Sequence, residues 1–299
     1  MTPQISAPRV LGPLGEVGPL AYGHWRFVGH ELSVATHLIE VALDAGMNLM
    51  DTADVYGLDW GGTAFGQAEE LLGRVLAATP GLRDRMVLAT KGGIAPPVPY
   101  DSSPAYLSQA LDASLRRLQT SHIDLYQIHR PDMYSHPEEV AAALDGFIDA
   151  GKVRAVGVSN HTPAQVDALI AHLRHDLVTV QPQYSVSHLQ PQRDGTLDQA
   201  MRIGAVPLAW SPLSGGSVVT GEGIRTELAV PLDRLAGREG VDRASIALAF
   251  VLAHPSRPVA IVGSQNPARI ASSAAALGVN LDRKDVYDLI QASEGQPLP

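Results

Sequence analysis

Short apolar runs alternate along this chain with longer amphipathic stretches. Each run is rich in β-branched residues and ends near a polar residue, and the stretch that follows repeats its apolar positions with a helical period. Eight runs are predicted strands: Pro19–Tyr22, Asn48–Thr52, Met86–Thr90, Ile123–Ile128, Val153–Val158, Val178–Pro182, Ala205–Ala209 and Val259–Val262. Alternating strands and helices are typical of parallel βαβ units, and eight such units close a barrel. The pattern therefore predicts the α/β class and a (β/α)8 TIM barrel.

Local start and stop signals support the helices between these runs. Four expected helices follow a polar capping residue: Ser33, Ser103, Thr162 and Asn266, the last three followed by proline. Three glycines stand where helices should end: Gly46, Gly151 and Gly278. Successive strands are mostly about thirty to forty residues apart, which suits a βα unit. We therefore expect residues 1–299 to form a single barrel domain.

Composition narrows the chemistry that the chain can perform. It contains no cysteine, which excludes disulfides, thiolate nucleophiles and Cys-rich zinc sites. Its formal net charge is -9, and no block of Lys and Arg offers contacts to a phosphate backbone. The N-terminus lacks the basic start and apolar stretch of a signal peptide, and no apolar run is long enough to span a bilayer. We expect a soluble, cytoplasmic protein with no nucleic-acid or membrane partner.

Four polar residues stand at or just beyond the ends of three consecutive predicted strands. Asp51 ends one strand and Tyr56 follows in the same loop, while Lys91 and His129 follow the next two. Barrel enzymes take their catalytic groups from the C-terminal ends of strands, so these side chains should meet at one mouth. Lys91 could favour ionisation of the Tyr56 phenol, Asp51 could keep Lys91 charged, and His129 could orient a carbonyl. The set predicts general-acid catalysis of carbonyl reduction.

Other interpretations of the same residues remain open. Taken singly, each has a structural explanation as a turn residue, a wall aromatic, a rim charge or a satisfied polar group. Lys91 could form a Schiff base, as in an aldolase-type barrel, although Asp51 would keep the amine protonated. A metal-dependent hydrolase is disfavoured, because the eleven histidines are scattered without H-x-H at a strand end or H-E-x-x-H. We expect no metal site.

A series of motifs resembles the aldo-keto reductase superfamily, with the IHRPD element closest to its bacterial oxidoreductase branches. The motifs are NLMDTADVYG, AEELLGRVL, MVLATKGG, IDLYQIHRPD, GKVRAVGVSN, VQPQYS, AWSPLSGG and IVGSQNPARI, and the resemblance runs from about Leu14 to Leu277. It implies that Asp51, Tyr56, Lys91 and His129 form the catalytic tetrad of an enzyme that reduces aldehydes or ketones with NADPH. The grouping that follows from the strand ends and the grouping that follows from the resemblance agree.

The resemblance also assigns residues to the cofactor. Ser159, Asn160 and Gln181 would bind the nicotinamide carboxamide, and Trp210 would stack on its ring. The pyrophosphate would lie against Ser211, Pro212, Leu213 and Gly215, and the adenosine ribose against Ser264, Gln265, Asn266 and Arg269. Arg269 is the natural partner of a 2′-phosphate, which favours NADPH. Many members have Lys where Gly263 stands, and an acidic residue followed by Asn in place of Ser272 and Ser273, so NADH stays open as an alternative.

The substrate side is less well marked in the sequence. The candidate wall residues are Tyr22, Trp25, Trp60, Tyr134 and His188, which would make an aromatic, mostly uncharged mouth. This mouth favours an apolar or aromatic aldehyde or ketone as the small-molecule substrate. The long segments GGIAPPVPYDSSP and SPLSGGSVVTGEG should carry function, because long loops on a barrel usually do. Some superfamily members are channel subunits, so a nucleotide-sensing regulatory subunit with little turnover also remains open.

Overall fold

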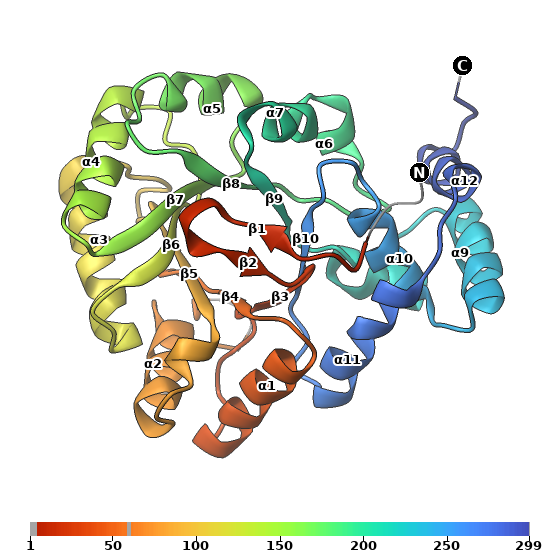
Figure 1. The fold of residues 1–299 in the computed structure, drawn as a ribbon, viewed down its shortest axis with the longest axis horizontal. Helices are drawn as coiled ribbons and strands as arrows, with labels where there is room; N and C mark the ends of the chain where they lie inside the picture. Colours follow the sequence, from red (N-terminus) through yellow and green to blue (C-terminus); the bar gives the residue numbers. More distant parts are fainter. Residues whose placement is uncertain (1–4, 59–60, 299) are drawn as a thin grey trace.

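Eight parallel strands close a barrel in the computed structural model, which describes residues 5–58 and 61–298 (Figure 1). The strands are β3 (Leu20–Gly23), β4 (Leu49–Asp51), β5 (Val87–Gly92), β6 (Ile123–Ile128), β7 (Val153–Ser159), β8 (Leu177–Gln181), β9 (Val206–Ala209) and β10 (Val259–Val262). Each strand pairs with its neighbours in sequence, and β10 pairs with β3 to close the ring. The predicted (β/α)8 barrel is confirmed, and every predicted strand occurs with its ends shifted by at most two residues.

Helices surround the barrel (Figure 1). They are α1 (Leu32–Asp44), α2 (Gln67–Ala78), α3 (Pro104–Leu118), α4 (Pro137–Asp149), α5 (Pro163–Ile170), α6 (Gln190–Arg193), α7 (Thr196–Ile203), α8 (Ser217–Thr220), α9 (Thr226–Glu239), α10 (Arg243–Leu252), α11 (Pro267–Ser272) and α12 (Arg283–Glu294). Across residues 5–58 and 61–298, no helix combines the length and the apolar character that crossing a bilayer requires.

Most of the expected helix caps occur where the sequence places them. The side chains of Ser103, Thr162 and Asn266 accept backbone N–H bonds at the starts of α3, α5 and α11. Ser33 is not a cap, because α1 begins at Leu32 and Ser33 lies in its first turn. Gly46 and Gly151 follow α1 and α4 with φ of 81° and 69°, a backbone conformation that favours glycine. Gly278 instead ends the 3-10 helix Ser273–Gly278 without a positive φ.

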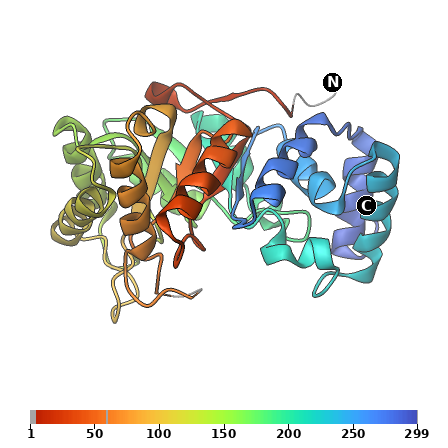
Figure 2. The same ribbon diagram turned by 90° about the horizontal axis from the view of Figure 1, so that it is seen from below.

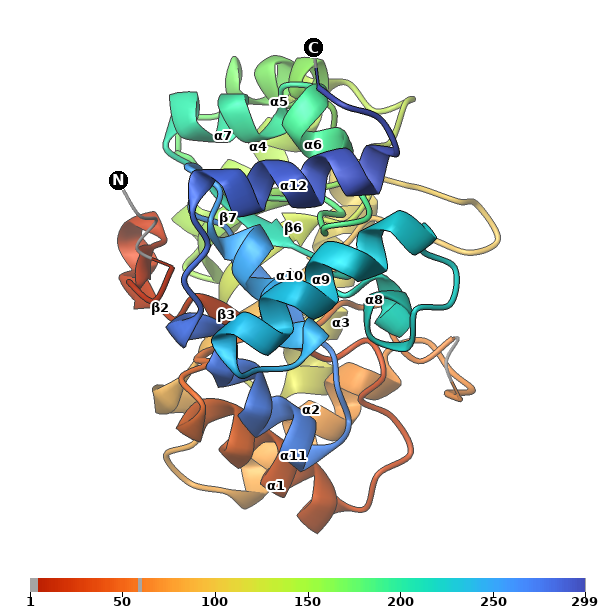
Figure 3. The same ribbon diagram turned by 90° about the vertical axis from the view of Figure 1, so that its right-hand side faces the viewer.

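A short N-terminal hairpin covers one end of the barrel. Its strands β1 (Arg9–Val10) and β2 (Glu16–Val17) are antiparallel, and they were not predicted because each has only two residues. Arg9 donates to the carbonyl of Pro258, which precedes β10, so the hairpin lies at the N-terminal ends of the strands. Figure 2 shows it on the side opposite the long loops, and Figure 3 places β2 and α8 at opposite ends. The C-terminal ends of the strands are thus left for a binding site.

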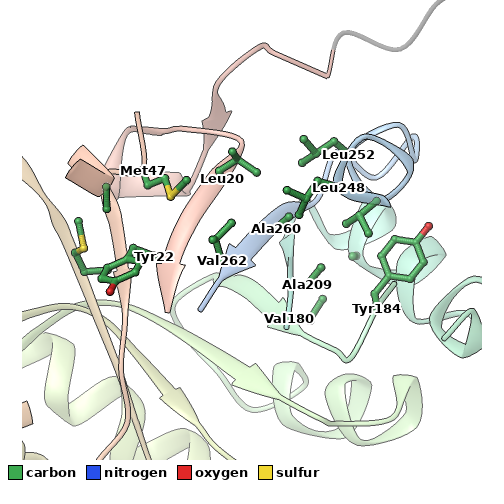
Figure 4. Packing of buried hydrophobic residues seen from close by; sticks show 14 of the residues in the cluster. Leu20, Tyr22, Met47, Val180, Tyr184, Ala209, Leu248, Leu252, Ala260 and Val262 are labelled. Carbon is green, nitrogen blue, oxygen red and sulfur yellow. The ribbon is translucent and has the colours of Figure 1, made fainter. Parts of the chain in front are cut away.

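Side chains along each strand alternate between the barrel interior and the helix layer. The interior and the hairpin share one buried cluster: Leu11, Leu14, Val17, Ala21, Leu49, Val87, Ala89, Leu125, Ala155, Val178, Leu208, Val259 and Ile261. Tyr22 follows Ala21 and therefore points outward, where it belongs to the larger cluster that contains Met47 (Figure 4). Lys91 stands two residues after Ala89, so it shares the inward face with that residue. Alternation therefore decides which polar residues reach the interior.

Candidate active site

A cavity of about 850 Å³ opens at the C-terminal ends of the barrel strands. Each of the eight strands, or the loop that follows it, contributes to its lining within the part of the chain that the structure describes. This volume lies in the usual range for small-molecule sites, roughly 300–1,000 Å³. The cavity is also at the end of the barrel where barrel enzymes place their chemistry. Asp51, Tyr56 and His129 line it, and Lys91 lies directly behind Tyr56.

The Lys91 ammonium is the centre of the polar network at this mouth. Its side chain is fully buried, and its Nζ donates to Asp51 Oδ2 at 2.8 Å, to the Thr52 carbonyl at 2.7 Å and to Tyr56 Oη at 3.2 Å. An ammonium has three donors, so all three are used. The Tyr56 and His129 rings meet edge to face, with their centroids 5.7 Å apart. The structure therefore brings all four predicted tetrad residues together.

Asp51 is held from its other oxygen by two amides. Its Oδ1 accepts from Gln181 Nε2 at 2.9 Å and from Gln127 Nε2 at 3.4 Å. Thr179 in turn donates to Gln127 Oε1 at 3.3 Å, which orients that amide. Gln127 was missed in the sequence, although it stands two residues before His129 and so shares its inward face. The carboxylate is thus both paired with Lys91 and fixed in orientation.

Burial and the neighbouring charges set the ionisation states of the tetrad. Burial by itself would lower the pKa of Lys91, but Asp51 and Tyr56 outweigh it and raise that pKa above the ordinary value. Burial raises the pKa of Tyr56, and the Lys91 ammonium opposes that rise without reversing it. Burial, with the cations Lys91 and Arg130 nearby, holds the pKa of His129 well below its usual range. At neutral pH the site therefore contains an ammonium, a protonated phenol and a neutral imidazole.

The residues expected at the nicotinamide form a network beside the tetrad. Asn160 donates from Nδ2 to the His129 carbonyl at 3.2 Å and to Ser159 Oγ at 2.7 Å. Its Oδ1 accepts from Trp210 Nε1 at 3.0 Å, which fixes the indole. Ser159, Asn160, Gln181 and Trp210 all line the cavity. The Asn160 amide nitrogen is thus bonded to His129 and Ser159, and its amide oxygen orients Trp210.

The segment after β9 adopts an unusual backbone. Ser211 and Ser214 have φ of 50° and 51°, and Gly215 and Gly216 have φ of 70° and 111°. Left-handed conformations are rare for residues with a side chain, and they concentrate at ligand-binding segments. The four residues expected at the pyrophosphate, Ser211, Pro212, Leu213 and Gly215, all line the cavity. The other predicted functional segment, after β5, reaches the cavity through Ile94.

The four residues expected at the adenosine ribose divide into two groups. Ser264 and Arg269 line the cavity, together with Gly263, Ser272 and Ser273. Gln265 lies outside the lining, and its Oε1 is 2.9 Å from His30 Nε2. Asn266 is also outside the lining, because its Oδ1 caps α11 by accepting from the backbone of Ala268 and Arg269. The structure thus leaves Ser264 and Arg269 as the side chains available there.

Of the four proposed wall residues that the structure describes, one is found at the cavity. Trp25 lines it, whereas Tyr22 is buried on the outer face of the barrel wall. Tyr134 is 98% exposed in the loop between β6 and α4, and His188 lies outside the lining in the loop after β8. Trp60 lies outside the described residues. Tyr22 was misplaced because one position along a strand changes the face, and loop residues have no such periodic signal.

Three charged or titratable residues at the mouth were not anticipated. Arg26 and Arg130 line the cavity, and the Arg130 guanidinium lies 6.0 Å from the centre of the Trp210 ring. His24 also lines it, and burial lowers the pKa of His24 to about 3. The expectation of a mostly uncharged mouth was wrong. Arg130 could have been found, because it directly follows the strand-end His129.

Two acidic side chains, Asp51 and Asp242, line the cavity and could in principle bind a metal ion. Among residues 5–58 and 61–298, no three His, Cys, Asp or Glu side chains group in a way that could hold a metal ion. The acidic groups at the mouth have other partners: Asp51 binds Lys91, and Asp242 caps the start of α10. The two carboxylates are therefore used in an ion pair and a helix cap.

Removing one partner of the buried Lys91–Asp51 pair should destabilise the protein strongly. We expect Lys91→Met to lower the free energy of unfolding by roughly 3–5 kcal/mol, because it leaves a buried carboxylate without its cation. Lys91→Met with Asp51→Asn should lose less than the sum of the two single changes. The exposed pair Lys152–Asp112 provides the control, and Lys152→Met should cost about 1 kcal/mol or less. Urea unfolding of the four variants measures this, and equal losses for Lys91→Met and Lys152→Met would contradict it.

Comparisons with known proteins agree with this geometry. The family model described as Aldo/keto reductase family matches residues 19–294. The chain is 50% identical over 295 residues to a 6-dehydroglucose reductase of Novosphingobium aromaticivorans, covering 97% of each protein. It is 36% identical to a 6-dehydroglucose reductase of Agrobacterium fabrum, over 95% of this chain and 96% of that protein. The solved glycerol dehydrogenase AKR11B4 from Gluconobacter oxydans superimposes with a TM-score of 0.84 at 27% identity, covering 99% of this chain and 98% of that one. This chain belongs to the aldo/keto reductase family of oxidoreductases.

Proposed function

We propose that this protein reduces an aldehyde to an alcohol with NADPH, using Tyr56 as the general acid. The observation that carries the proposal is the hydrogen bond from the Lys91 ammonium to the Tyr56 hydroxyl at the cavity wall. A neutral phenol is a poor acid, and an adjacent cation stabilises the phenolate that remains after the proton has left. Tyr56 is partly exposed to the cavity, so its proton can reach a bound carbonyl oxygen.

The remaining tetrad residues prepare that transfer. Asp51 keeps Lys91 charged, and the amides of Gln181 and Gln127 keep the Asp51 carboxylate in place. His129 is neutral and lines the cavity beside Tyr56, so one N–H can bind the carbonyl oxygen and orient it toward the phenol. The proton then moves from Tyr56 Oη to the carbonyl oxygen, and Lys91 stabilises the phenolate.

The residues around the cavity fit a nicotinamide dinucleotide. When bound, NADPH supplies the hydride that completes carbonyl reduction. Trp210 is fixed by Asn160 and presents its ring to the cavity, where it could stack on an aromatic group. The left-handed segment from Ser211 to Gly216 would face the pyrophosphate, and Arg269 would pair with the 2′-phosphate. With Gln265 and Asn266 bonded elsewhere, Arg269 carries most of the preference for NADPH over NADH.

We propose a hydroxylated sugar aldehyde, of which 6-dehydroglucose is an example, as the substrate class. Two relatives that match nearly the whole chain are named 6-dehydroglucose reductases. The mouth supports this choice over an apolar aldehyde, because Arg26 and Arg130 bring guanidinium donors to the cavity. Trp25 and Trp210 add aromatic faces for the C–H groups of a sugar ring. Hydroxyl groups would thus find donors, and the carbon skeleton would find apolar surface.

A panel of aldehydes tests the activity and the substrate class together. The loss of reduced-nicotinamide absorbance would be followed with 6-dehydroglucose, other hydroxylated aldehydes and apolar aromatic aldehydes, with NADPH and with NADH. We expect kcat/KM to be at least about tenfold higher for the hydroxylated group, because its hydroxyl groups can accept hydrogen bonds from the Arg130 guanidinium and an apolar substrate cannot. Higher kcat/KM for the aromatic aldehydes would contradict the substrate class. Tight NADPH binding without turnover on any member would instead favour a nucleotide-sensing subunit.

Tyr56→Phe should remove carbonyl reduction while leaving the fold and cofactor binding intact. The change deletes the proton donor together with one of the three acceptors of Lys91, and we expect kcat to fall roughly 10²- to 10⁴-fold. The Kd for NADPH, measured by quenching of tryptophan fluorescence, should change less than about threefold, within the spread expected for a single lost hydrogen bond. Tyr134→Phe is the matched control, since Tyr134 is 98% exposed and away from the cavity. Undiminished turnover in Tyr56→Phe would exclude Tyr56 as the acid.

An aldolase-type reaction on Lys91 is disfavoured by the same geometry. Its three N–H donors are all engaged, and its pKa is raised, so the amine stays protonated and cannot attack a carbonyl. Borohydride treatment in the presence of substrate should leave Lys91 unmodified. A trapped adduct on Lys91, detected by peptide mass spectrometry, would restore the Schiff-base interpretation.

Arg269→Ala should weaken NADPH binding more than NADH binding. Removing a charge-assisted contact to the 2′-phosphate should raise the Kd for NADPH roughly tenfold to a hundredfold, while the Kd for NADH stays nearly constant. Arg283→Ala changes an exposed arginine on α12, which lies outside the cavity lining, and serves as the control. Equal losses for both nucleotides in Arg269→Ala would show that another group recognises the phosphate.

A further inference from the structure

A buried carboxyl group without a side-chain hydrogen-bond partner lies in the loop that carries Tyr56. Asp54 is fully buried, and neither of its oxygens is bonded to another side chain among the residues that the structure describes. In the same part of the chain the hydroxyl of Tyr126, which points outward from β6, has no partner either. A Cβ on Gly92 would lie 2.1 Å from Tyr126 Oη and 3.4 Å from Asp54 Oδ2, so the tyrosine hydroxyl occupies the place of a side chain at this glycine and the Asp54 carboxyl group lies close to it. A buried polar group needs a partner, because an unsatisfied one costs about 1–3 kcal/mol.

The cations near Asp54 in the described part of the chain, Arg117 and Lys91, are bonded to other groups. Glu69 is also fully buried, and it accepts from Thr90 Oγ1 at 2.5 Å and from Arg117 Nε at 2.7 Å. Arg117 Nη2 is paired with the same Glu69 carboxylate. Lys91 has already used its three donors. Two buried carboxyl groups thus share one guanidinium, and that guanidinium is bound to Glu69.

We propose that Asp54 keeps its proton and is hydrogen-bonded to the Tyr126 hydroxyl through one buried water molecule, which fixes the loop that positions Tyr56. Asp54, Tyr126 and Glu69 together form a buried polar cluster. The cluster lies between β5, β6 and α2, on the outer side of the barrel wall. None of its three residues lines the cavity, so Asp54 is a positioning residue. A water molecule would account for both unpartnered groups, because it can satisfy a carboxyl group and a hydroxyl together.

The backbone connects Asp54 to both ends of the Lys91–Tyr56 hydrogen bond. The Asp54 N–H donates to the Lys91 carbonyl at 3.0 Å, and the Tyr56 N–H donates to the Ala53 carbonyl at 3.2 Å. Thr52 is tied to β5 in the same way, through the carbonyl of Ala89. An ionised Asp54 would repel Glu69 and lack a counterion, which would displace this loop. The 3.2 Å hydrogen bond between Lys91 Nζ and Tyr56 Oη depends on the position of this loop, because the loop carries Tyr56.

The groups that surround Asp54 favour its protonated form. Burial raises the pKa of Asp54 well above its ordinary value, and the Glu69 carboxylate on α2 adds to the rise. Arg117 on α3, the Val55 N–H of the same loop and Lys91 on β5 oppose it without reversing it. Tyr126 on β6 and Tyr106 on α3 are neutral, because burial raises the pKa of both phenols. Among residues 5–58 and 61–298, the two cations that act on Asp54 are thus both bonded to other groups.

A retained proton makes stability depend on pH in a defined direction. The unfolded chain releases the Asp54 proton near pH 4, whereas the folded chain keeps it, so the folded state binds more protons above that pH. The contribution of this residue to stability therefore falls as pH rises from about 4 toward the folded-state pKa. Asp54→Asn has the same shape and no proton to lose. The difference between its Tm and that of the parent protein should therefore grow as the pH rises from 5 to 8, because only the parent loses this contribution to stability.

The experiment compares Asp54→Asn with Asp54→Leu, and uses Asp112→Asn as a surface control, since Asp112 forms an exposed ion pair. The Asn side chain can donate and accept as a protonated carboxyl does, and Leu can do neither. We expect Asp54→Asn to keep kcat within about threefold, and Asp54→Leu to lose roughly tenfold or more with the Kd for NADPH unchanged, a loss comparable to one or two buried hydrogen bonds. The parent's infrared spectrum should contain a protonated-carboxyl band that is missing in Asp54→Asn and present in Asp112→Asn.

The turnover arm rests on the proposed reductase function, whereas the infrared, thermal and exchange arms need no substrate. Amide hydrogen exchange across residues 51–57 should quicken in Asp54→Leu and stay near the parental rate in Asp54→Asn. A parent without turnover would overturn the proposed function alone. Any one of three results would overturn the role of Asp54. They are a protonated-carboxyl band that survives in Asp54→Asn, a Tm difference that does not vary with pH, and amide hydrogen exchange at the same rate in Asp54→Asn and Asp54→Leu. If Asp54→Leu does not fold, the Asn variant still decides the protonation.

Discussion

The buried Lys91 ammonium imposes the arrangement of everything around it. Moving an ion of this size out of water costs several kcal/mol even after the protein relaxes, and the cost is recovered only if every donor finds a good acceptor. Lys91 lies on β5, and its three acceptors all come from β4 and the loop that follows: Asp51, the Thr52 carbonyl and Tyr56. That loop therefore cannot move independently of β5. The requirement that stabilises a buried cation also fixes the distance between the cation and the phenol.

The same strands carry two different polar layers because their side chains alternate in direction. Lys91 and Gln127 point into the barrel, where they meet Asp51. Their sequence neighbours Thr90 and Tyr126 point outward, toward Glu69 and Asp54. The inner layer pairs each charge and faces the cavity, whereas the outer layer has one cation for two acids. A proton can neutralise the second acid, so the outer layer can remain buried without a further cation.

Sequence patterns predicted what depends on local periodicity and missed what depends on distant contacts. The eight strands and the convergence of Asp51, Tyr56, Lys91 and His129 followed from alternation and from the geometry of a barrel. Tyr22 was misplaced because strand boundaries are uncertain by one residue, which is enough to reverse the face of a side chain. Gln265 pairs with His30, more than two hundred residues away, and no local pattern could indicate that the amide was engaged. Arg130 directly follows His129, but it lies beyond the strand end, where side-chain direction no longer follows the alternation of the strand.

Backbone strain at Asn160 and after β9 is a further property that the sequence largely conceals. Asparagine enters left-handed conformations more readily than most residues with a side chain, but serine has no such signature, and Asn160, Ser211 and Ser214 adopt φ between 50° and 59°. Each costs about 1–3 kcal/mol unless its surroundings stabilise it. Those surroundings are visible for Asn160, whose amide binds the His129 carbonyl, Ser159 and Trp210, and for Ser214, whose hydroxyl contacts Ser185 and Ser187. Hydrogen bonds from neighbouring strand ends therefore hold the segment after β9 in a conformation that its own residues disfavour. A binding surface preformed in this way spares the ligand part of the ordering cost.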